Sequence, residues 1–346
     1  MRLQTVDVKR CGRESDVGCL MNDNRIVLKG TNKRDAGGFL LFVFLLPYVC
    51  ACLWGHVGEE TDALRSDGQV QETDAVQYKV QVDMNWGLWE IPMEDYLAYK
   101  LEAVMPGNYE PEALKAQAVL LRTELVQIFR EEGENLRIAG DNLEKWYEAG
   151  DTEEELAPYR QAVEETKGQY LCYQGEPVQA SYFRLSNGQT RNAEEVWHTD
   201  KCPYLTGTAC EQDKASKDYS RDVTVSRVNF LYEIRSRIGE EYADQELWDG
   251  ISFSYDSAGY VTDVSFIIEE KEVGKLDGET FRHLFSLPSA SFEMEQGETK
   301  LIFHVTGAGH GFGMSQYGAN SRALNGQTYD QILKDFFSGT ELAKFE

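Results

Sequence analysis

The stretch IPMEDYLAYKLEAVMPGNYEPEALKAQAVLLRT, residues 91–123, decides the fold of this chain and predicts two consecutive helices. The first opens at Met93 and must end before Pro106, because a proline inside a helix loses a hydrogen bond and clashes with the preceding turn. The second begins at Pro111, since proline suits the first helical turn. Its apolar residues alternate at spacings of four and three, which places them on one buried face. They are Leu114, Ala118, Leu121, Leu125 and Ile128.

Strand patterns lie on both sides of these helices. Apolar residues alternate with polar ones over residues 78–84, 169–183 and 251–268, and Asp256–Gly259 has the composition of a hairpin turn. Residues 131–160 are polar and are expected to be helical with glycine breaks, and an amphipathic helix over 329–337 closes the chain. Strands and helices segregate instead of alternating as βαβ units. We therefore expect an α+β fold of mixed helices and antiparallel strands.

The charge of the chain is strongly negative and unevenly placed. Its 346 residues include 59 Asp and Glu against 34 Lys and Arg, a formal net charge of −25. Such a surface repels polyanions, so nucleic acid is excluded as a partner. Residues 1–36 are the exception, with eight Lys or Arg against five Asp or Glu. The net charge of the chain therefore changes from positive to negative near residue 37.

A hydrophobic segment marks that change. Residues 37–58 contain no Lys, Arg, Asp or Glu, and about 20 apolar residues suffice to span a bilayer. Basic residues before the segment place the N-terminus inside. The alternatives are a single-pass anchor or uncleaved signal, a cleaved secretory signal, and a buried core segment.

The resulting domain plan has four parts. Residues 1–36 form a basic cytoplasmic tail, 37–58 the anchor or signal, 59–75 a flexible acidic linker, and 76–346 the folded domain. The chain is expected in the cell membrane with its main domain outside the cytoplasm, or secreted if the leader is cleaved.

Three cysteines, Cys172, Cys202 and Cys210, belong to the exported part. Because Cys202 and Cys210 are close in sequence, they can form one disulfide. Alternatively they join His198 in a zinc site, but that set lacks a fourth ligand. We expect no metal and no cofactor.

Several blocks together resemble one family. They are residues 91–123, TKGQYLCYQGEPV (166–178), RLSNGQTRNAEEVW (184–197), PYL (203–205), LPSASF (287–292) and GHGFGMSQYGA (309–319). These blocks resemble the stage II sporulation protein D family (SpoIID) and its relative, the amidase enhancer LytB, from about residue 76 to the C-terminus. The resemblance implies a glycan-binding cleft and a lytic transglycosylase that acts on peptidoglycan outside the membrane during spore formation.

The implied chemistry depends on one carboxylic acid. In the family a protonated Glu gives its proton to the bridging oxygen between two sugars, and the muramic acid's own hydroxyl closes an anhydro ring. That Glu stands immediately before a Met-Pro pair, where this chain has Val104. A valine cannot donate a proton. The candidates for a relocated acid are Glu102, which lies about 200° around the helix from Val104, Glu144 and His310.

The resemblance also implies substrate-binding residues. Arg184 stands where many members have a histidine, and the polar loop after it carries Ser186, Asn187 and Thr190. The glycine-rich block is expected to bring His310, Ser315 and Gln316 to a surface, lining the glycan cleft opposite the helix of Val104. Arg122 either anchors a buried carboxylate or contacts substrate.

Three functions remain open at this point. The first is a noncatalytic module that binds peptidoglycan glycan strands or enhances an amidase, with a cell-wall amidase or hydrolase as partner. The second is an active lytic transglycosylase with a relocated acid. The third is an envelope scaffold that binds no sugar.

Overall fold

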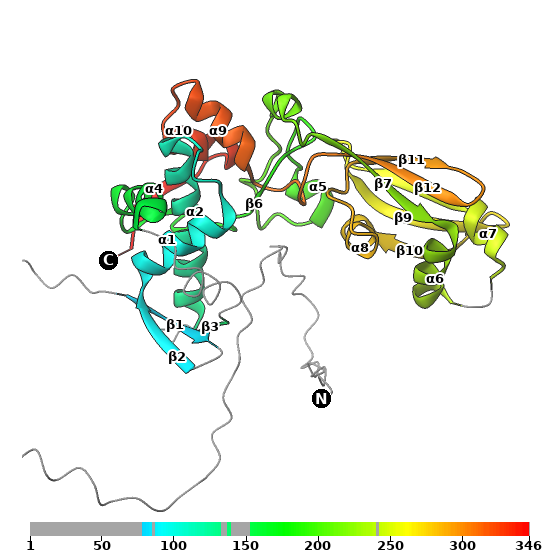
Figure 1. The fold of residues 1–346 in the computed structure, drawn as a ribbon, viewed down its shortest axis with the longest axis horizontal. Helices are drawn as coiled ribbons and strands as arrows, with labels where there is room; N and C mark the ends of the chain where they lie inside the picture. Colours follow the sequence, from blue (N-terminus) through cyan, green and yellow to red (C-terminus); the bar gives the residue numbers. More distant parts are fainter. Residues whose placement is uncertain (1–77, 85–86, 133–136, 140–152, 240–241, 346) are drawn as a thin grey trace, which may run out of the picture.

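The computed structural model describes residues 78–84, 87–132, 137–139, 153–239 and 242–345. They form two lobes, each around its own hydrophobic core (Figure 1). The first, which we call the helical lobe, contains the described residues up to 219 and those from 307 onwards. The second, the sheet lobe, contains residues 220–306. Both cores lie within the segment 76–346 that the sequence analysis treats as one domain.

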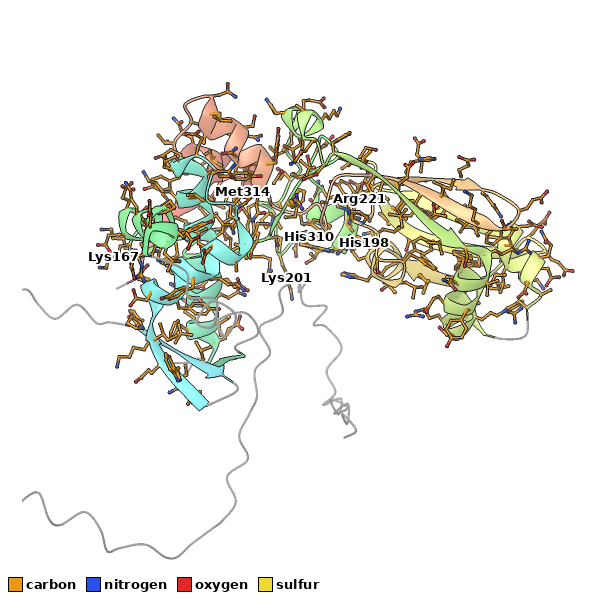
Figure 2. All side chains as sticks on the ribbon, in the orientation of Figure 1. Lys167, His198, Lys201, Arg221, His310 and Met314 are labelled. Carbon is orange, nitrogen blue, oxygen red and sulfur yellow. The ribbon has the colours of Figure 1, made fainter. Side chains whose placement is uncertain are left out.

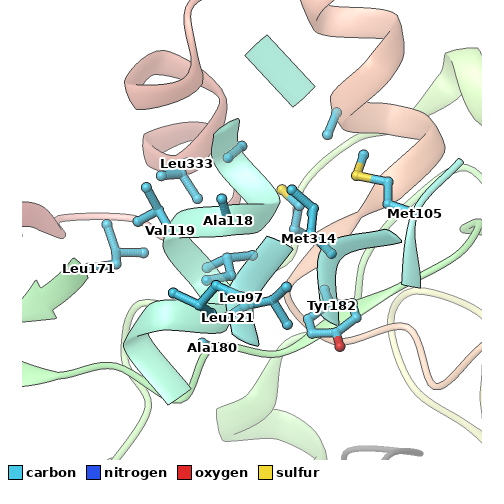
Figure 3. Close-up of a cluster of buried hydrophobic side chains, with 14 of the residues drawn as sticks. Leu97, Met105, Ala118, Val119, Leu121, Leu171, Ala180, Tyr182, Met314 and Leu333 are labelled. Carbon is cyan, nitrogen blue, oxygen red and sulfur yellow. The ribbon is translucent and has the colours of Figure 1, made fainter. Parts of the chain in front are cut away.

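The helices of the helical lobe follow the proline signals. Helix α1 spans Met93–Val104 and ends before Pro106, and α2 spans Pro111–Glu132, as predicted. The other helices of eight or more residues in the described part of this lobe are α4 (Glu153–Glu165), α9 (Gln316–Leu324) and α10 (Tyr329–Phe336). Helix α2 packs against all four of the others, and its predicted apolar face is buried apart from the half-buried Ile128. Figure 3 shows this core, with side chains of α2 between Leu97, Leu333 and Met314.

Short strands surround these helices. Strands β1 (Lys79–Met84), β2 (Gly87–Pro92) and β3 (Arg137–Ala139) form a sheet in the order β2-β1-β3, antiparallel in the first pair and parallel in the second. Strand β4 (Gln169–Tyr173) lies between β14 (Glu341–Lys344) and β5 (Glu176–Pro177). Strand β6 (Tyr182–Phe183) pairs in parallel with β13 (Met314–Ser315). A short helix α5 (Ala193–Trp197) and the 3₁₀ helix η1 (Glu211–Ala215) follow β6.

The sheet lobe consists of two antiparallel three-stranded sheets. One has the order β10 (Lys271–Asp277), β9 (Val261–Ile268), β8 (Ile251–Tyr255), and the other β11 (Phe292–Gln296), β12 (Lys300–Thr306), β7 (Ser220–Ser226). Helices α6 (Arg227–Ile238), α7 (Asp244–Asp249) and α8 (Gly278–Leu284) complete the lobe around a core rich in phenylalanine. The hairpin turn predicted at Asp256–Gly259 joins β8 to β9. The predicted α+β class is confirmed.

Several predictions fall on residues outside the described ranges. These are the tail, the anchor or signal at 37–58, the linker at 59–75 and Glu144. Of the helices in the described part of the chain, none is both long and apolar enough to span a bilayer.

Candidate functional site

The end of α1 meets the glycine-rich block at Gln316. Pairing of β6 with β13 sets the start of α9 beside the helical core. The Gln316 Nε2 atom donates a hydrogen bond to the Val104 carbonyl oxygen at 2.9 Å and another to Gln117 Oε1 at 3.2 Å. Two stretches that are far apart in the sequence therefore lie together, as the sequence analysis expected.

The loop after α1 is fixed from two sides. The Tyr159 hydroxyl donates to the Met105 carbonyl oxygen at 3.0 Å, and the Glu110 backbone N–H donates to Asn320 Oδ1 at 2.7 Å. Val104 is half-buried between the exposed Ala103 and the buried Met105. The position that corresponds to the family's acid is thus partly exposed and has a hydrocarbon side chain.

The glycines of the block let its backbone pack closely against neighbouring chain. Gly313 has φ +74°, and a Cβ there would lie 2.0 Å from the Ser181 carbonyl oxygen. Gly311 has φ +86°, and a Cβ there would lie 2.8 Å from the Arg191 side chain. Other residues would be strained at both positions. The block is consequently held inside the protein.

The expectation that this block presents its polar side chains at a surface is wrong. His310, Ser315 and Gln316 have exposed fractions of 2%, 0% and 5%. His310 Nδ1 accepts a hydrogen bond from the Phe312 backbone N–H at 3.1 Å, and its carbonyl oxygen accepts one from Arg191 Nη1 at 3.3 Å. The physical reason is the close packing that the glycines allow. A role of these residues in substrate binding stays a prediction.

A buried carboxylate that sequence reasoning missed holds the predicted serines. Asp213 Oδ2 accepts hydrogen bonds from the Ser186 N–H at 2.8 Å, the Ser186 hydroxyl at 2.7 Å and the Ser315 hydroxyl at 2.6 Å. Burial raises the pKa of Asp213. Since Asp213 stands in no motif, only the fold shows that it joins η1 to both loops.

The other predicted substrate residues differ in exposure. Arg184 is exposed and pairs with Asp218 at 2.5 Å. Its charge also acts on Tyr109, where burial raises the pKa of the phenol and Arg184 lowers it. Asn187 Nδ2 donates to the Ala258 carbonyl oxygen at 2.8 Å, which links the lobes. Thr190 is buried, and its hydroxyl accepts from the Thr208 N–H at 2.7 Å. Arg184 is therefore the member of this set best placed to meet a ligand.

The remaining charged candidates take structural positions. Glu102 is half-buried on α1, and its charge raises the pKa of Tyr159, which burial raises more. Arg122 is fully buried and donates from Nε to Glu94 Oε1 at 3.0 Å and from Nη2 to Glu94 Oε2 at 2.5 Å. Of the two interpretations of Arg122, the carboxylate anchor is confirmed.

The described cysteines are all free thiols, so the possible Cys202–Cys210 disulfide is not formed. Cys202 accepts a hydrogen bond from the Tyr204 hydroxyl at 3.7 Å, whereas Cys210 donates to the Thr208 carbonyl oxygen at 3.6 Å. Burial raises the pKa of Cys210 to about 11. Among the described residues, no group of three or more His, Cys, Asp or Glu side chains, including the set with His198, is arranged to hold a metal ion.

Comparisons with known proteins show the family of this chain. A family model described as "Stage II sporulation protein" matches residues 87–173. Stage II sporulation protein D of Bacillus subtilis (strain 168) is 30% identical over 274 residues, which cover 75% of this chain and 77% of the relative. The protein of the same name from Bacillus amyloliquefaciens is 31% identical over 276 residues, 75% and 76% of the two chains. This chain belongs to the stage II sporulation protein D family.

A further relative of this SpoIID-family chain carries a different name. The amidase enhancer of Bacillus subtilis (strain 168) is 24% identical over 305 residues, which cover 70% of this chain and 39% of the relative. Membership of the SpoIID family together with this similarity suggests a cell-wall function related to sporulation.

Proposed function

We propose that this protein is a noncatalytic member of the SpoIID family that binds peptidoglycan glycan strands or enhances a cell-wall amidase. The observation that carries the proposal is Val104, a hydrocarbon side chain at the family's acid position, beside Gln316. Cleavage of a glycosidic bond needs a group that gives a proton to the leaving oxygen. Valine has no such proton. The similarity to an amidase enhancer supports the alternative in which the protein enhances an amidase.

The relocated acids gain little support from the geometry. His310 is 2% exposed and lies beside the Phe183 ring, at 5.6 Å between ring centroids. A glycan cannot reach it without opening the block. Glu102 points about 200° away from Val104 around α1 and acts on Tyr159. We further propose that residues 37–58 anchor the protein in the cell membrane, with the described lobes outside the cytoplasm.

Digestion and binding together test the proposal. The full-length chain is incubated with peptide-stripped glycan strands, the products are analysed by mass spectrometry for anhydro ends, and bound strands are measured by pull-down. The expected result is binding without anhydro products. The proposal would be overturned if anhydro products form and are lost in Glu102→Gln. They should persist in the control Glu164→Gln, which lies on the exposed face of α4. If the chain neither cuts nor binds the glycan strands, and does not accelerate an added amidase, the result favours the envelope scaffold.

A further inference from the structure

A cavity of about 470 Å³ lies between the two lobes, away from Val104. Its volume falls in the range of small-molecule sites, about 300–1,000 Å³, and such sites occur preferentially where domains meet. The helical lobe contributes α5, His198 and Phe312, and the sheet lobe contributes the ends of β8, β9 and β10 and the start of α8. Figure 2 shows His198 in the region between the lobes. We call this cavity the inter-lobe pocket.

The inter-lobe pocket is separate from the Val104 region. Neither Val104 nor Gln316 lines it. Arg191 forms part of its wall, with the guanidinium 4.6 Å from the Phe312 ring centroid and 5.1 Å from the Tyr260 ring centroid. The same Arg191 donates to the His310 carbonyl oxygen of the glycine-rich block at 3.3 Å. A ligand in the pocket therefore borders the glycine-rich block at Phe312 without touching Val104 or Gln316.

The carboxylates of the pocket already have hydrogen-bond donors within the protein. Five acidic side chains and two permanent cations line it. Each carboxylate accepts a hydrogen bond from a protein donor; the pairs are Glu195 with the Ser257 N–H at 2.8 Å, Asp256 with Arg191 at 2.6 Å, Asp263 with Lys275 at 3.0 Å, Asp277 with the Thr280 N–H at 2.8 Å and Glu279 with Arg282 at 2.7 Å.

This pairing selects the kind of ligand. A carboxylate has about four acceptor sites, so a fixed, paired carboxylate can still accept from a hydroxyl or amide group. Three of the five have a cationic partner, and Glu195 and Asp277 accept from the neutral N–H groups of Ser257 and Thr280. The acidic excess, in turn, disfavours anions such as phosphate. A neutral ligand rich in hydroxyl groups fits these conditions.

Aromatic side chains supply flat apolar surfaces at the same place. Tyr255 is 52% exposed at the end of β8, and Trp197 is half-buried at the end of α5. Trp197 is held by Phe312, with 4.3 Å between ring centroids. Such rings pack against the apolar face of a ligand while their polar edge stays in water. Flat rings beside fixed acceptors are the complement of a pyranose ring.

We propose that the inter-lobe pocket is a second saccharide-binding site, which takes neutral N-acetylated sugar units. This inference rests on the proposed function, because the wall glycan supplies the sugar. It adds a contact that does not involve Val104 or Gln316, so that one glycan strand or two neighbouring strands engage both regions. The two lobes are already joined beside the pocket by Arg191 with Asp256 and by Glu195 with Ser257, so the site is built before the ligand arrives.

Calorimetric titration of the full-length chain with a tetramer of N-acetylglucosamine tests the pocket. We expect Tyr255→Ala to weaken the binding step of the pocket about tenfold. Thr262→Phe, which fills the pocket, should remove that step and leave the binding that depends on Arg184. Tyr232→Ala is the matched control, since Tyr232 is 72% exposed on α6 and does not line the pocket. It should leave the affinity unchanged.

The outcomes separate this inference from the proposed function. Unchanged tetramer binding in both pocket variants, with weaker binding in Arg184→Ala, would overturn the pocket and leave glycan binding in place. A stem peptide that competes with the tetramer in the native chain and loses affinity in Tyr255→Ala would overturn the sugar assignment. If neither the tetramer nor whole glycan strands bind, the proposed function fails as well.

Discussion

The Gln316 side-chain amide joins the Val104 carbonyl oxygen, at 2.9 Å, to Gln117 Oε1, at 3.2 Å. Gln316 and Val104 are 212 positions apart in the chain, and their hydrogen bond ties the end of α1 to the glycine-rich block. The backbone at position 104 is therefore fixed although its side chain lacks an acid. A change of that one side chain need not disturb its surroundings.

Val104→Glu is expected to restore cleavage of glycan strands. The new carboxyl group would stand at the family's acid position on a backbone held by Gln316, and a positioned general acid contributes about 10²–10⁴-fold to rate. The measurement is the yield of anhydro-ended products from peptide-stripped strands, by mass spectrometry with the full-length chain.

Val104→Gln is the matched control for this gain of function. Its amide has nearly the shape of the glutamic acid but no acidic proton, so it should yield no products. Equal product formation by both variants, or none by Val104→Glu in a folded protein that still binds strands, would contradict the view that the acid alone has been lost.

Asp213→Ala is expected to lower the free energy of unfolding by about 3 kcal/mol, because it leaves the buried donors of Ser186 and Ser315 without their acceptor. Ser315→Ala keeps the two bonds from Ser186 to Asp213, but it loses its own bond to Asp213 and the N-cap of α9, where its hydroxyl accepts from the Gly318 N–H. Its loss should be smaller, about 2 kcal/mol. Urea unfolding measures both. A Ser315→Ala loss as large as that of Asp213→Ala would show that Asp213 is not the centre of this network.

Local signals made much of the helical lobe predictable. Pro106 and Pro111 determine where α1 ends and where α2 begins, and the spacing of Leu114, Ala118 and Leu121 gives the buried face of α2. These effects act within one or two helical turns. The hairpin turn at Asp256–Gly259 is likewise determined by residues that are close together in the sequence.

The site could be predicted only in part, because its geometry arises from long-range packing. The glycine spacing of the block is visible in the sequence, but its inward packing against Ser181 and Arg191 depends on residues more than 100 positions away. Asp213 has no local pattern. The inter-lobe pocket likewise combines α5 with α8, a helix of seven residues, which is too short for a clear periodicity.

Arg122, which is fully buried, forms an ion pair with the partly buried Glu94. Its guanidinium donates to both oxygens of Glu94 and to the carbonyl oxygens of Val163 and Gln169. Because the Glu94 side chain left behind is 24% exposed, the loss should be below that of a fully buried pair, and we expect Arg122→Met to lose about 2–3 kcal/mol of stability.

Arg122→Lys keeps the charge but not the planar fork that binds both oxygens. It should recover only part of the loss, as measured by urea unfolding. Full recovery by lysine would mean that charge alone, without the two-oxygen geometry, stabilises this core.

The three strands β7, β12 and β11 carry a pH-sensitive group. His304 Nδ1 lies 2.8 Å from Asp222 Oδ1, and its Nε2 lies 3.7 Å from Glu295 Oε2. The hydrogen bond with Asp222 raises the pKa of His304 above its ordinary value of 6.5, and Glu295 adds to the effect. Because the folded pKa is the higher one, the stabilisation is fully present below the unfolded pKa and is lost as the pH rises through the folded pKa.

We therefore expect the native chain to have a higher thermal midpoint than His304→Gln at about pH 5.5, with the difference shrinking as the pH rises through and beyond the folded pKa of His304. The effect should be small, since the three side chains are exposed and salt screens them. Asp222→Asn should flatten the same pH dependence, because it removes the main cause of the raised pKa. A difference that grows with pH would mean that neutral His304, and not its charged form, stabilises these strands.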